Sequence, residues 1–337
     1  MTLTRMKWPR LLILLYFVGM TVGLLWLLAN SEIWCQKSGP EGEASNKRNG
    51  ANGYERVSYL EARLRKHFPM QIEAILSETD SDVPYIYAIT PTYDRLVQKA
   101  ELTRLMHTFL HIRNFHWIIV EDAKHMTEKV RNLLKSSGIK YTHLAEPTPE
   151  DFKLHKDDPN WLKPRGVPQR NRALQWLVDN RNIVRVPSVI YFADDDNTYS
   201  LDVFEEMRHT DKVSVWPVGL VGKMLYESPV LNEQNKVVGW HTYWHPERTF
   251  ASDMAGFAIG MQHFMRHPKT RFSVFSARGY LESDFISHLE VTLLDLEPKA
   301  DLCKKVLVWH TRTEEPNLKS ERKLQKQGKG SDAKMEI

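Results

Sequence analysis

Residues 189–196 read VIYFADDD, an apolar, β-rich run that ends in three consecutive aspartates. A short apolar run of this kind predicts a buried strand of an α/β sheet. In open α/β sheets, ligands bind beyond the carboxyl ends of the strands, where Asp194, Asp195 and Asp196 are expected to lie. In an extended chain Asp194 and Asp196 point to one side and Asp195 points to the other.

The aspartate triplet favours a metal site. Three adjacent carboxylates repel one another unless a cation compensates their charge. Hard oxygen ligands suit Mg²⁺ or Mn²⁺, which commonly bridge a carboxylate to the phosphates of a substrate. The alternative is a solvated acidic turn that caps the next helix with the help of Asn197. Because the triplet ends a buried strand, the pattern favours the metal–phosphate interpretation.

The surrounding sequence alternates strand and helix patterns, which predicts an α/β fold with a mostly parallel sheet. Further strands are expected at 85–90, 115–120 and 139–144, and helices at 95–113, 124–136 and 168–179. The second half is less regular. It is expected to continue the sheet and to add elements that hold a second substrate, with strands at 213–218, 236–240 and 306–309 and helices at 262–267 and 282–290.

Composition and absent motifs exclude several classes of protein. The chain has 337 residues, 42% of them apolar, which is typical of a globular protein. Its net charge of +4 is too small to indicate nucleic acid as a partner. Two cysteines cannot build a disulfide framework or a cysteine zinc site. Neither GxxxxGK[ST] nor GxGxxG occurs, which disfavours a P-loop NTPase and a Rossmann enzyme.

The N-terminal region predicts a membrane anchor. Residues 11–29 are 19 uncharged residues, about 28 Å long as a helix, and Arg5, Lys7 and Arg10 precede them. The positive-inside rule then places residues 1–10 in the cytosol and the rest of the chain in a lumen, as a single-pass type II membrane protein. A removable signal peptide and a buried core helix are the alternatives.

Residues 30–83 are expected to form a luminal stem, because a polar, Gly- and Ser-rich part of it cannot bury a core. Cys35 lies just beyond the anchor and about 270 residues from Cys303. Its position suggests an intermolecular bridge in a homodimer, with an unpaired thiol as the alternative. The polar, lysine-rich stretch 321–335 is expected to be mobile or bound to a partner.

Basic residues near predicted element ends are candidates for binding a diphosphate. Arg165 and Arg170 lie in PRGVPQRN at the entry to a helix, whose N-terminus also favours an anion. His310 and Arg312 alternate after the strand-like KVLV, so both reach one face. The alternatives are an exposed helix arginine for Arg170 and a strand-end pair for His310 and Arg312.

A second group of residues has the chemistry of sugar binding. Trp244, Arg248 and Asp253 occur in one stretch, where a ring can cover the C–H face of a sugar and charged groups can bind its hydroxyls. Glu282, in GYLESD, is a candidate general base. A core tryptophan with surface charges, and an ordinary first-turn glutamate, are the alternatives.

Nine motifs between residues 84 and 316 resemble, in order, those of the animal β-1,3-glucuronosyltransferases. They are PTYDR (91–95), VEDA (120–123), PRGVPQRN (164–171), YFADDDNTYS (191–200), VSVWPVGLVG (213–222), DMAGFA (253–258), GYLES (279–283), DLEPKA (295–300) and VLVWHTRTEEP (306–316). The resemblance implies a GT-A type nucleotide-sugar transferase fold. It implies a Golgi enzyme with a luminal catalytic domain at 84–337, made of a UDP-sugar half (84–197), an acceptor half (198–316) and a tail (317–337).

The resemblance also implies a donor, a metal and residue roles. The donor would be UDP-glucuronate and the metal Mn²⁺, with Asp196 as its ligand and Asp194 and Asp195 at the uridine. The rest of the donor site would be Pro91, Thr92, Tyr93, Asp122, Arg165, Arg170, His310, Thr311 and Arg312. The acceptor site would be Glu227, Trp244, Arg248 and Asp253, with Glu282 as the catalytic base.

The implied reaction is a single inverting displacement at the anomeric carbon by the 3-hydroxyl of a galactose. Two acceptors compete, namely the galactose–galactose–xylose linker of proteoglycans and the galactose–N-acetylglucosamine unit that carries the HNK-1 epitope. Trp244 and the tail KLQKQGKGSD favour the linker, whereas GYLES and HLEVTLLDLEPKA resemble the other branch. A membrane-tethered inactive lectin and a metal-dependent phosphohydrolase are alternatives from other classes.

Overall fold

A computed structural model describes residues 83–154, 158–159, 162–331 and 335. The chain divides into two compact units, Met1–Glu73 and Ala74–Ile337, and every described residue lies in the second. The expected anchor, the stem as far as residue 82, and Cys35 therefore lie outside the described residues. Within the described ranges, no helix has both the length and the apolar character needed to cross a bilayer.

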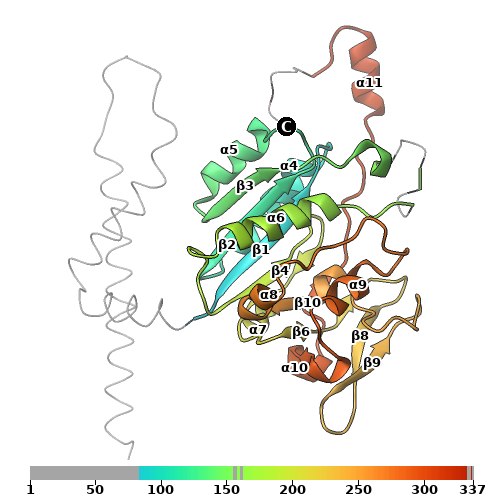
Figure 1. Ribbon diagram of the computed structural model, residues 1–337. Helices are drawn as coiled ribbons and strands as arrows, with labels where there is room; N and C mark the ends of the chain where they lie inside the picture. The colour runs from blue at the N-terminus through green and yellow to red at the C-terminus, as the bar shows by residue number, and fades with distance from the viewer. Residues whose placement is uncertain (1–82, 155–157, 160–161, 332–334, 336–337) are drawn as a thin grey trace, which may run out of the picture. The chain divides into compact units, whose positions relative to one another are not determined.

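A seven-stranded mixed sheet forms the centre of the described unit (Figure 1), with strand order β11-β6-β10-β4-β1-β2-β3. Four of its six strand pairings are parallel, and the two antiparallel ones are those of β10 with β4 and β6. The predicted mixed, mostly parallel α/β architecture is confirmed. The strands are β1 Tyr85–Thr92, β2 Phe115–Glu121, β3 Tyr141–Ala145, β4 Ser188–Phe192, β6 Val213–Val215, β10 Phe257–Gly260 and β11 Glu297–Pro298.

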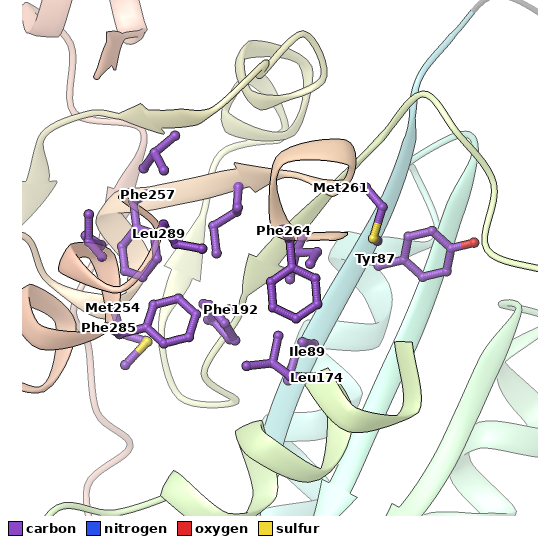
Figure 2. Packing of buried hydrophobic residues seen from close by; sticks show 14 of the residues in the cluster. Tyr87, Ile89, Leu174, Phe192, Met254, Phe257, Met261, Phe264, Phe285 and Leu289 are labelled. Atoms are coloured by element: carbon purple, nitrogen blue, oxygen red, sulfur yellow. The ribbon is translucent and has the colours of Figure 1, made fainter. Parts of the chain in front are cut away.

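Both faces of the large sheet are covered by helices, so its central strands β1, β2 and β4 are almost entirely buried. Successive side chains of a strand point to opposite faces, so Ile86 and Ala88 join one hydrophobic cluster and Tyr87 and Ile89 join the other. One face packs against helices α4 Gln98–Phe109, α5 Glu128–Ser137 and α7 Leu201–Met207. The other packs against α6 Val167–Asp179, α8 Met261–Arg266 and α9 Leu281–Ser287 (Figure 2).

Local signals explain where the helices begin and end. Helix α5 begins at Glu128, four residues later than predicted, because the Thr127 side chain caps it by accepting a hydrogen bond from the Val130 N–H at 3.4 Å. It ends at Gly138, whose φ of +69° is a left-handed conformation that glycine adopts without strain. Strand β1 continues through Pro91, because β4 ends opposite Ile89 and the missing N–H interrupts no pairing there.

The second half differs from the prediction of one continued sheet. The predicted strand 213–218 is wrong as a single element, since β6 ends at Val215 and β7 Val218–Gly219 belongs to a second sheet. The Trp216 indole between them is buried and donates to the Ala255 carbonyl at 2.9 Å. The second sheet has the order β5-β12-β7-β8-β9, with β5 Thr198–Tyr199, β8 Tyr226–Leu231, β9 Val237–His241 and β12 Val308–Trp309.

Short elements complete the described unit. Three 3₁₀ turns lie at Glu150–Phe152, Met254–Gly256 and Leu293–Asp295, and the short helix α10 spans Ala300–Cys303. Cys303 is a free, half-buried thiol. The polar tail contains a helix that was not predicted, α11 Lys319–Lys326. The order of elements places the carboxyl ends of β1, β2 and β4 side by side, and the candidate site lies at that edge.

Candidate active site

A cavity of about 590 Å³ opens at the carboxyl ends of β1, β2 and β4 and also reaches the start of α9. It brings together residues as far apart in the sequence as Pro91 and His310. Twelve of the predicted site residues line it, namely Pro91, Thr92, Tyr93, Asp122, Arg165, Arg170, Asp194, Asp195, Asp196, Asp253, Glu282 and His310. We call the side with the aspartate triplet the donor wall and the side with Asp253 and Glu282 the acceptor wall.

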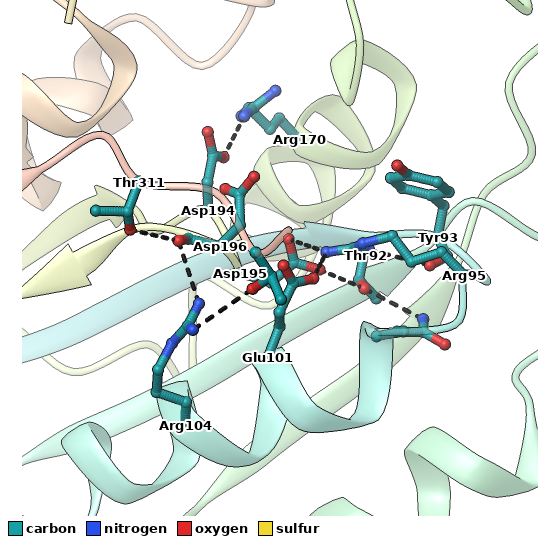
Figure 3. A network of polar contacts seen from close by, with 12 residues as sticks. Thr92, Tyr93, Arg95, Glu101, Arg104, Arg170, Asp194, Asp195, Asp196 and Thr311 are labelled. Atoms are coloured by element: carbon teal, nitrogen blue, oxygen red, sulfur yellow. Dashed lines mark hydrogen bonds and ion pairs between the residues drawn. The ribbon is translucent and has the colours of Figure 1, made fainter. Parts of the chain in front are cut away.

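Asp195 is the most enclosed carboxylate of the donor wall (Figure 3). It accepts a hydrogen bond from the Thr92 hydroxyl at 2.7 Å and forms an ion pair with Arg95 at 2.7 Å. Burial raises its pKa to about 6, although the Arg95 charge opposes the shift. Arg95 also pairs with the buried Glu101, so one guanidinium holds two carboxylates. Asp195 is thus held by Thr92 and Arg95, whereas its neighbour Asp194 is held by Arg170.

Asp194 points toward helix α6, where it forms a short ion pair with Arg170 (Figure 3). Arg170 also donates to the Arg165 carbonyl at 2.9 Å, and this places its guanidinium against the entry of the helix. Gly166 is needed at that entry, because its φ is +73° and a Cβ there would lie 2.5 Å from the Arg170 Nη1 atom. The Tyr199 hydroxyl fixes the Asp194 backbone by donating to its carbonyl at 2.8 Å.

Asp196 is held through its backbone. Its carbonyl oxygen accepts hydrogen bonds from the Thr311 hydroxyl at 2.7 Å and from the Arg104 guanidinium at 3.2 Å (Figure 3). Among the described residues, its carboxylate takes part in no hydrogen bond or ion pair. Burial, and then the charge of Asp194, raise the pKa of this carboxyl group. A carboxylate that is fixed in place and unshared is suited to bind a cation.

The donor wall fits a divalent cation that is shared with a ligand. In the described ranges, no three His, Cys, Asp or Glu side chains converge into a complete metal cage. Mg²⁺ and similar hard cations are usually held by one or two carboxylates together with substrate phosphates. Asp196 supplies such a carboxylate beside Asp194, and Arg165, Arg170 and His310 line the same cavity as positive or polar groups. The residues therefore fit a metal–diphosphate site.

Asp122 and Tyr93 lie on the donor side, away from the aspartate triplet. Both Asp122 oxygens are occupied by Thr148, whose backbone N–H and hydroxyl each donate at 2.7 Å. Tyr93 is 45% exposed, and the Arg95 guanidinium lies 4.5 Å from its ring centroid. An exposed ring with one covered face can stack on a planar ligand with the other face.

Glu282 has the properties of a general base. It lies in the first turn of α9 and lines the cavity. Burial raises its pKa to about 7, and the negative charge of Asp253 adds to the shift. Among the described residues it makes no ion pair that would hold it ionised. A carboxylate with a pKa near neutrality can accept a proton efficiently at physiological pH.

Asp253 and His310 connect the acceptor wall to the donor wall. Asp253 accepts a hydrogen bond from the Ala255 N–H at 2.9 Å, and its other oxygen lies 3.8 Å from the His310 Nδ1 atom. Burial raises the pKa of Asp253, and the facing His310 opposes that shift. His310 follows β12, which pairs with β7, so the second sheet positions this contact.

Five predicted residues do not line the cavity. Arg248 is the clearest case, because its guanidinium donates to three backbone carbonyls, those of Trp244, His245 and Gly279, at 2.8, 3.1 and 2.7 Å. It therefore ties the Trp244 loop to the segment that enters α9. Trp244 is 39% exposed, with the Arg278 guanidinium 4.8 Å from its ring centroid.

The other three predicted residues that do not line the cavity are Glu227, Thr311 and Arg312. Glu227 is buried in β8, where the Thr242 hydroxyl makes a short hydrogen bond to it, and burial raises its pKa. Thr311 contacts the Asp196 backbone and the Thr198 hydroxyl. Arg312 is exposed. Thr311 thus supports the donor wall from behind rather than lining the cavity.

A family model of glycosyltransferase family 43 matches residues 105–314. The chain belongs to glycosyltransferase family 43. Mouse "galactosylgalactosylxylosylprotein 3-beta-glucuronosyltransferase 3" is 45% identical over 96% of this chain and 97% of its own length. The Drosophila melanogaster protein of that name, numbered I, is 49% identical over 80% and 89%. The rat protein numbered 1 is 52% identical over 72% of each chain.

Solved structures add little to this assignment. The structure of S. aureus TarS 1–349 in complex with UDP-GlcNAc is 15% identical, with a TM-score of 0.42, and covers 70% of this chain and 61% of that chain. This likeness is too weak to support a conclusion.

Sequence reasoning missed several residues of this family 43 site. They are Arg95, Gln98, Glu101 and Arg104, which surround the triplet, and Thr148, which holds Asp122. Arg95 belongs to the motif PTYDR, so its place two residues after the predicted site residue Tyr93 could have indicated that it belongs to the site. Glu101 is buried beside Leu102 and Leu105 on α4. An acidic residue on the buried side of a helix requires a buried cation, but the sequence does not say which one.

Proposed function

We propose that this family 43 protein transfers glucuronate from UDP-glucuronate to the 3-hydroxyl of a terminal galactose, with inversion at the anomeric carbon. The observation that carries the proposal is the cavity with two unlike walls. One wall fits a metal–diphosphate group, and the other presents Glu282 with a pKa near 7. The names and near-complete coverage of the relatives support the same reaction.

The donor wall would bind the nucleotide sugar. Asp196 would hold the divalent cation, which we propose to be Mn²⁺, and this cation supplies positive charge that stabilises the diphosphate leaving group. Arg165 and His310 would contact the phosphates. Tyr93, with Asp122 behind it, would hold the uracil ring, and Pro91 and Thr92 would form the floor beneath it. Arg170, already paired with Asp194, would orient the glucuronate carboxylate.

The acceptor wall would perform the proton transfer. Glu282 would take the proton of the galactose 3-hydroxyl as that oxygen attacks the anomeric carbon. Asp253 would accept a hydrogen bond from a neighbouring hydroxyl, and its charge keeps Glu282 basic. One displacement on an α-linked donor gives a β-linked product.

The acceptor that we propose is the galactose–galactose–xylose linker of proteoglycans. Trp244 supports it, because this half-exposed ring lies against Gly279, three residues before Glu282, and can stack on the penultimate galactose. An N-acetyl group on that sugar would need extra room and a hydrogen-bond partner.

A kinetic comparison tests the function and the acceptor together. We expect the kcat/KM for Galβ1-3Gal-xylose to exceed that for Galβ1-4GlcNAc by about 10–200-fold, the discrimination one sugar contact can provide. UDP release that does not depend on acceptor would indicate a phosphohydrolase, and binding without release would indicate a lectin. Equal values would mean a broad-specificity enzyme, and a reversed ratio would favour the HNK-1 branch.

We further propose a Golgi type II membrane protein, anchored by residues 11–29, that pairs as a homodimer through Cys35. The charge distribution around the apolar segment supports this topology. Protease digestion of the C-terminal tail in intact vesicles from the cytosolic side would contradict it. Non-reducing electrophoresis should show a species near twice 39.4 kDa that Cys35→Ser removes.

A further inference from the structure

A second hollow of about 990 Å³ lies beside the candidate active site, between the first turn of α6, the end of α8 and the end of α9. Its lining includes three permanent cations, Arg266, Lys269 and Arg271, and only one carboxylate, Glu290. The lining therefore carries a net charge of +2 before His267 and His288 are counted. We call this hollow the basic groove.

The charges of the basic groove are not neutralised from within. The Arg271 guanidinium donates to the carbonyls of Pro268 and Thr270 at 2.9 and 2.7 Å, and to the Gln175 side chain at 2.6 Å. These are neutral oxygens, so the positive charge stays available to a ligand. Arg266 and Lys269 are exposed, and in the described part of the chain neither forms an ion pair. Burial lowers the pKa of Arg271, although the nearby charge of Asp179 opposes the shift.

The basic groove borders the active-site cavity. Phe275 lines the groove and Phe152 lines the cavity, and their rings meet edge to face at 5.4 Å. Helix α9 connects the two sites, since Glu282 lies in its first turn and His288 follows its last. Six residues of helix separate these positions by about 9 Å. The loop that begins in the groove also carries Arg278, which lies over the Trp244 ring.

We propose that the basic groove binds an acidic stretch of the polypeptide that carries the acceptor glycan. This inference rests on the proposed function, because it assigns the groove to the protein part of a glycoprotein acceptor. Carboxylates of the polypeptide complement the three cations. The apolar part of the lining, with Val274 half-buried and Phe275 83% exposed, suits apolar side chains between the acidic ones. A sulfated polysaccharide offers no such side chains.

Three acceptors with the same galactose–galactose–xylose trisaccharide test the proposal. One carries it on a serine flanked by four glutamates, the second replaces these glutamates with glutamine, and the third is a simple benzyl glycoside. At low ionic strength we expect kcat/KM for the acidic peptide to be about tenfold higher than for the neutral one, because several exposed pairs contribute at once. The advantage should decline with added salt.

The double variant Arg266→Glu and Lys269→Glu should abolish this preference while leaving transfer to the benzyl glycoside unchanged. The matched control is Lys135→Glu, an exposed position at the end of α5, which packs on the opposite face of the sheet. Unchanged preference in the double variant, or equal kcat/KM for the two wild-type peptides, would overturn the proposal. Inhibition by a heparin oligosaccharide without any acidic-peptide advantage would also overturn it, in favour of a polysaccharide.

The two proposals fail differently. If none of the three acceptors receives glucuronate, the proposed function is wrong. If the benzyl glycoside is a good acceptor and only the peptide charge has no effect, the function stands and the groove assignment is wrong.

Discussion

The donor wall and the acceptor wall bury carboxylates to a similar extent but compensate them differently. At the donor wall, Asp194 and Asp195 are each paired with an arginine. At the acceptor wall, Glu282 has no cation partner among the described residues, and its pKa rises to about 7. The comparison shows how one cavity can hold fixed anions on one side and a proton acceptor on the other.

The difference has a chemical reason. An arginine beside Glu282 would keep it ionised but would lower its pKa and weaken it as a base. The same arginine beside Asp194 or Asp195 does no harm, because those groups only need to stay in position. Asp196 is intermediate, since its backbone is fixed and its carboxylate is left for a cation. Five predictions test this division, from the largest expected effect to the smallest.

Replacing Glu282 with glutamine should have the largest effect. The amide keeps the shape of the side chain and removes its basicity, so kcat should fall about 10³-fold, within the range of general-base contributions. UDP binding should stay within a factor of two, as measured by calorimetry. Glu233→Gln, at an exposed position in the β8–β9 turn, is the control and should change neither quantity. Near-normal turnover would remove Glu282 from the role of base.

Replacing Arg95 with alanine should destabilise the fold most. The change leaves Asp195 and Glu101 buried without their shared cation, which should cost about 3 kcal/mol in the free energy of unfolding. Lys129→Ala breaks an ion pair with the exposed Asp94 and should cost less than about 1 kcal/mol. Urea unfolding of both variants gives the comparison.

The loss of unfolding free energy in Arg95→Ala, called the deficit below, should depend on pH. The pKa of Asp195 is already raised to about 6, so its neutral form is favoured in the folded protein, and losing Arg95 favours it further. Stability linked to a raised pKa is lost as pH rises through the folded value. The deficit should therefore be smaller at pH 5 than at pH 7.5. A deficit that is equal at both values would mean that Asp195 is not the affected group.

Replacing Asp196 with asparagine should weaken Mn²⁺-dependent UDP binding and spare binding without metal. We expect the affinity for Mn²⁺ to fall by more than about tenfold, because losing a direct ligand should cost more than losing a residue that only orients one. Asp202→Asn, at an exposed position in α7, is the matched control. Calorimetric titration of UDP at several Mn²⁺ concentrations measures the effect, and an unchanged metal dependence would assign the ligand to another residue.

The smallest expected effect is a gain in stability of Glu282→Gln at high pH. In the wild type the unfolded chain ionises Glu282 near its ordinary pKa of 4.5, whereas the folded protein does so only near 7. Stability is therefore lost between these values, and the glutamine variant avoids the loss. Its melting temperature should exceed that of the wild type by a few degrees at pH 8 and by much less at pH 4.5. A constant difference across this range would contradict the raised pKa.

The strands and helices of the first half were predictable because their signals are local. Apolar runs such as 189–193 and 115–120 are complete in a few residues, and strand alternation already separated Asp195 from Asp194 and Asp196. The second half was harder. Strand β6 and strand β7 follow each other in sequence but join different sheets, and the buried contact between Trp216 and Ala255 that accompanies this break joins residues 39 positions apart. No local pattern reports such a contact.

The sequence by itself determined the α/β class, the aspartate triplet at a strand end, and the residue types that could carry the chemistry. These depend on periodicity and on short motifs. Only the tertiary structure decided which charges meet. Asp195 finds Thr92 across 103 positions, and Arg248 binds three carbonyls instead of lining the cavity. The pKa of Glu282 also depends on burial and on Asp253, groups that the chain brings together only when it folds.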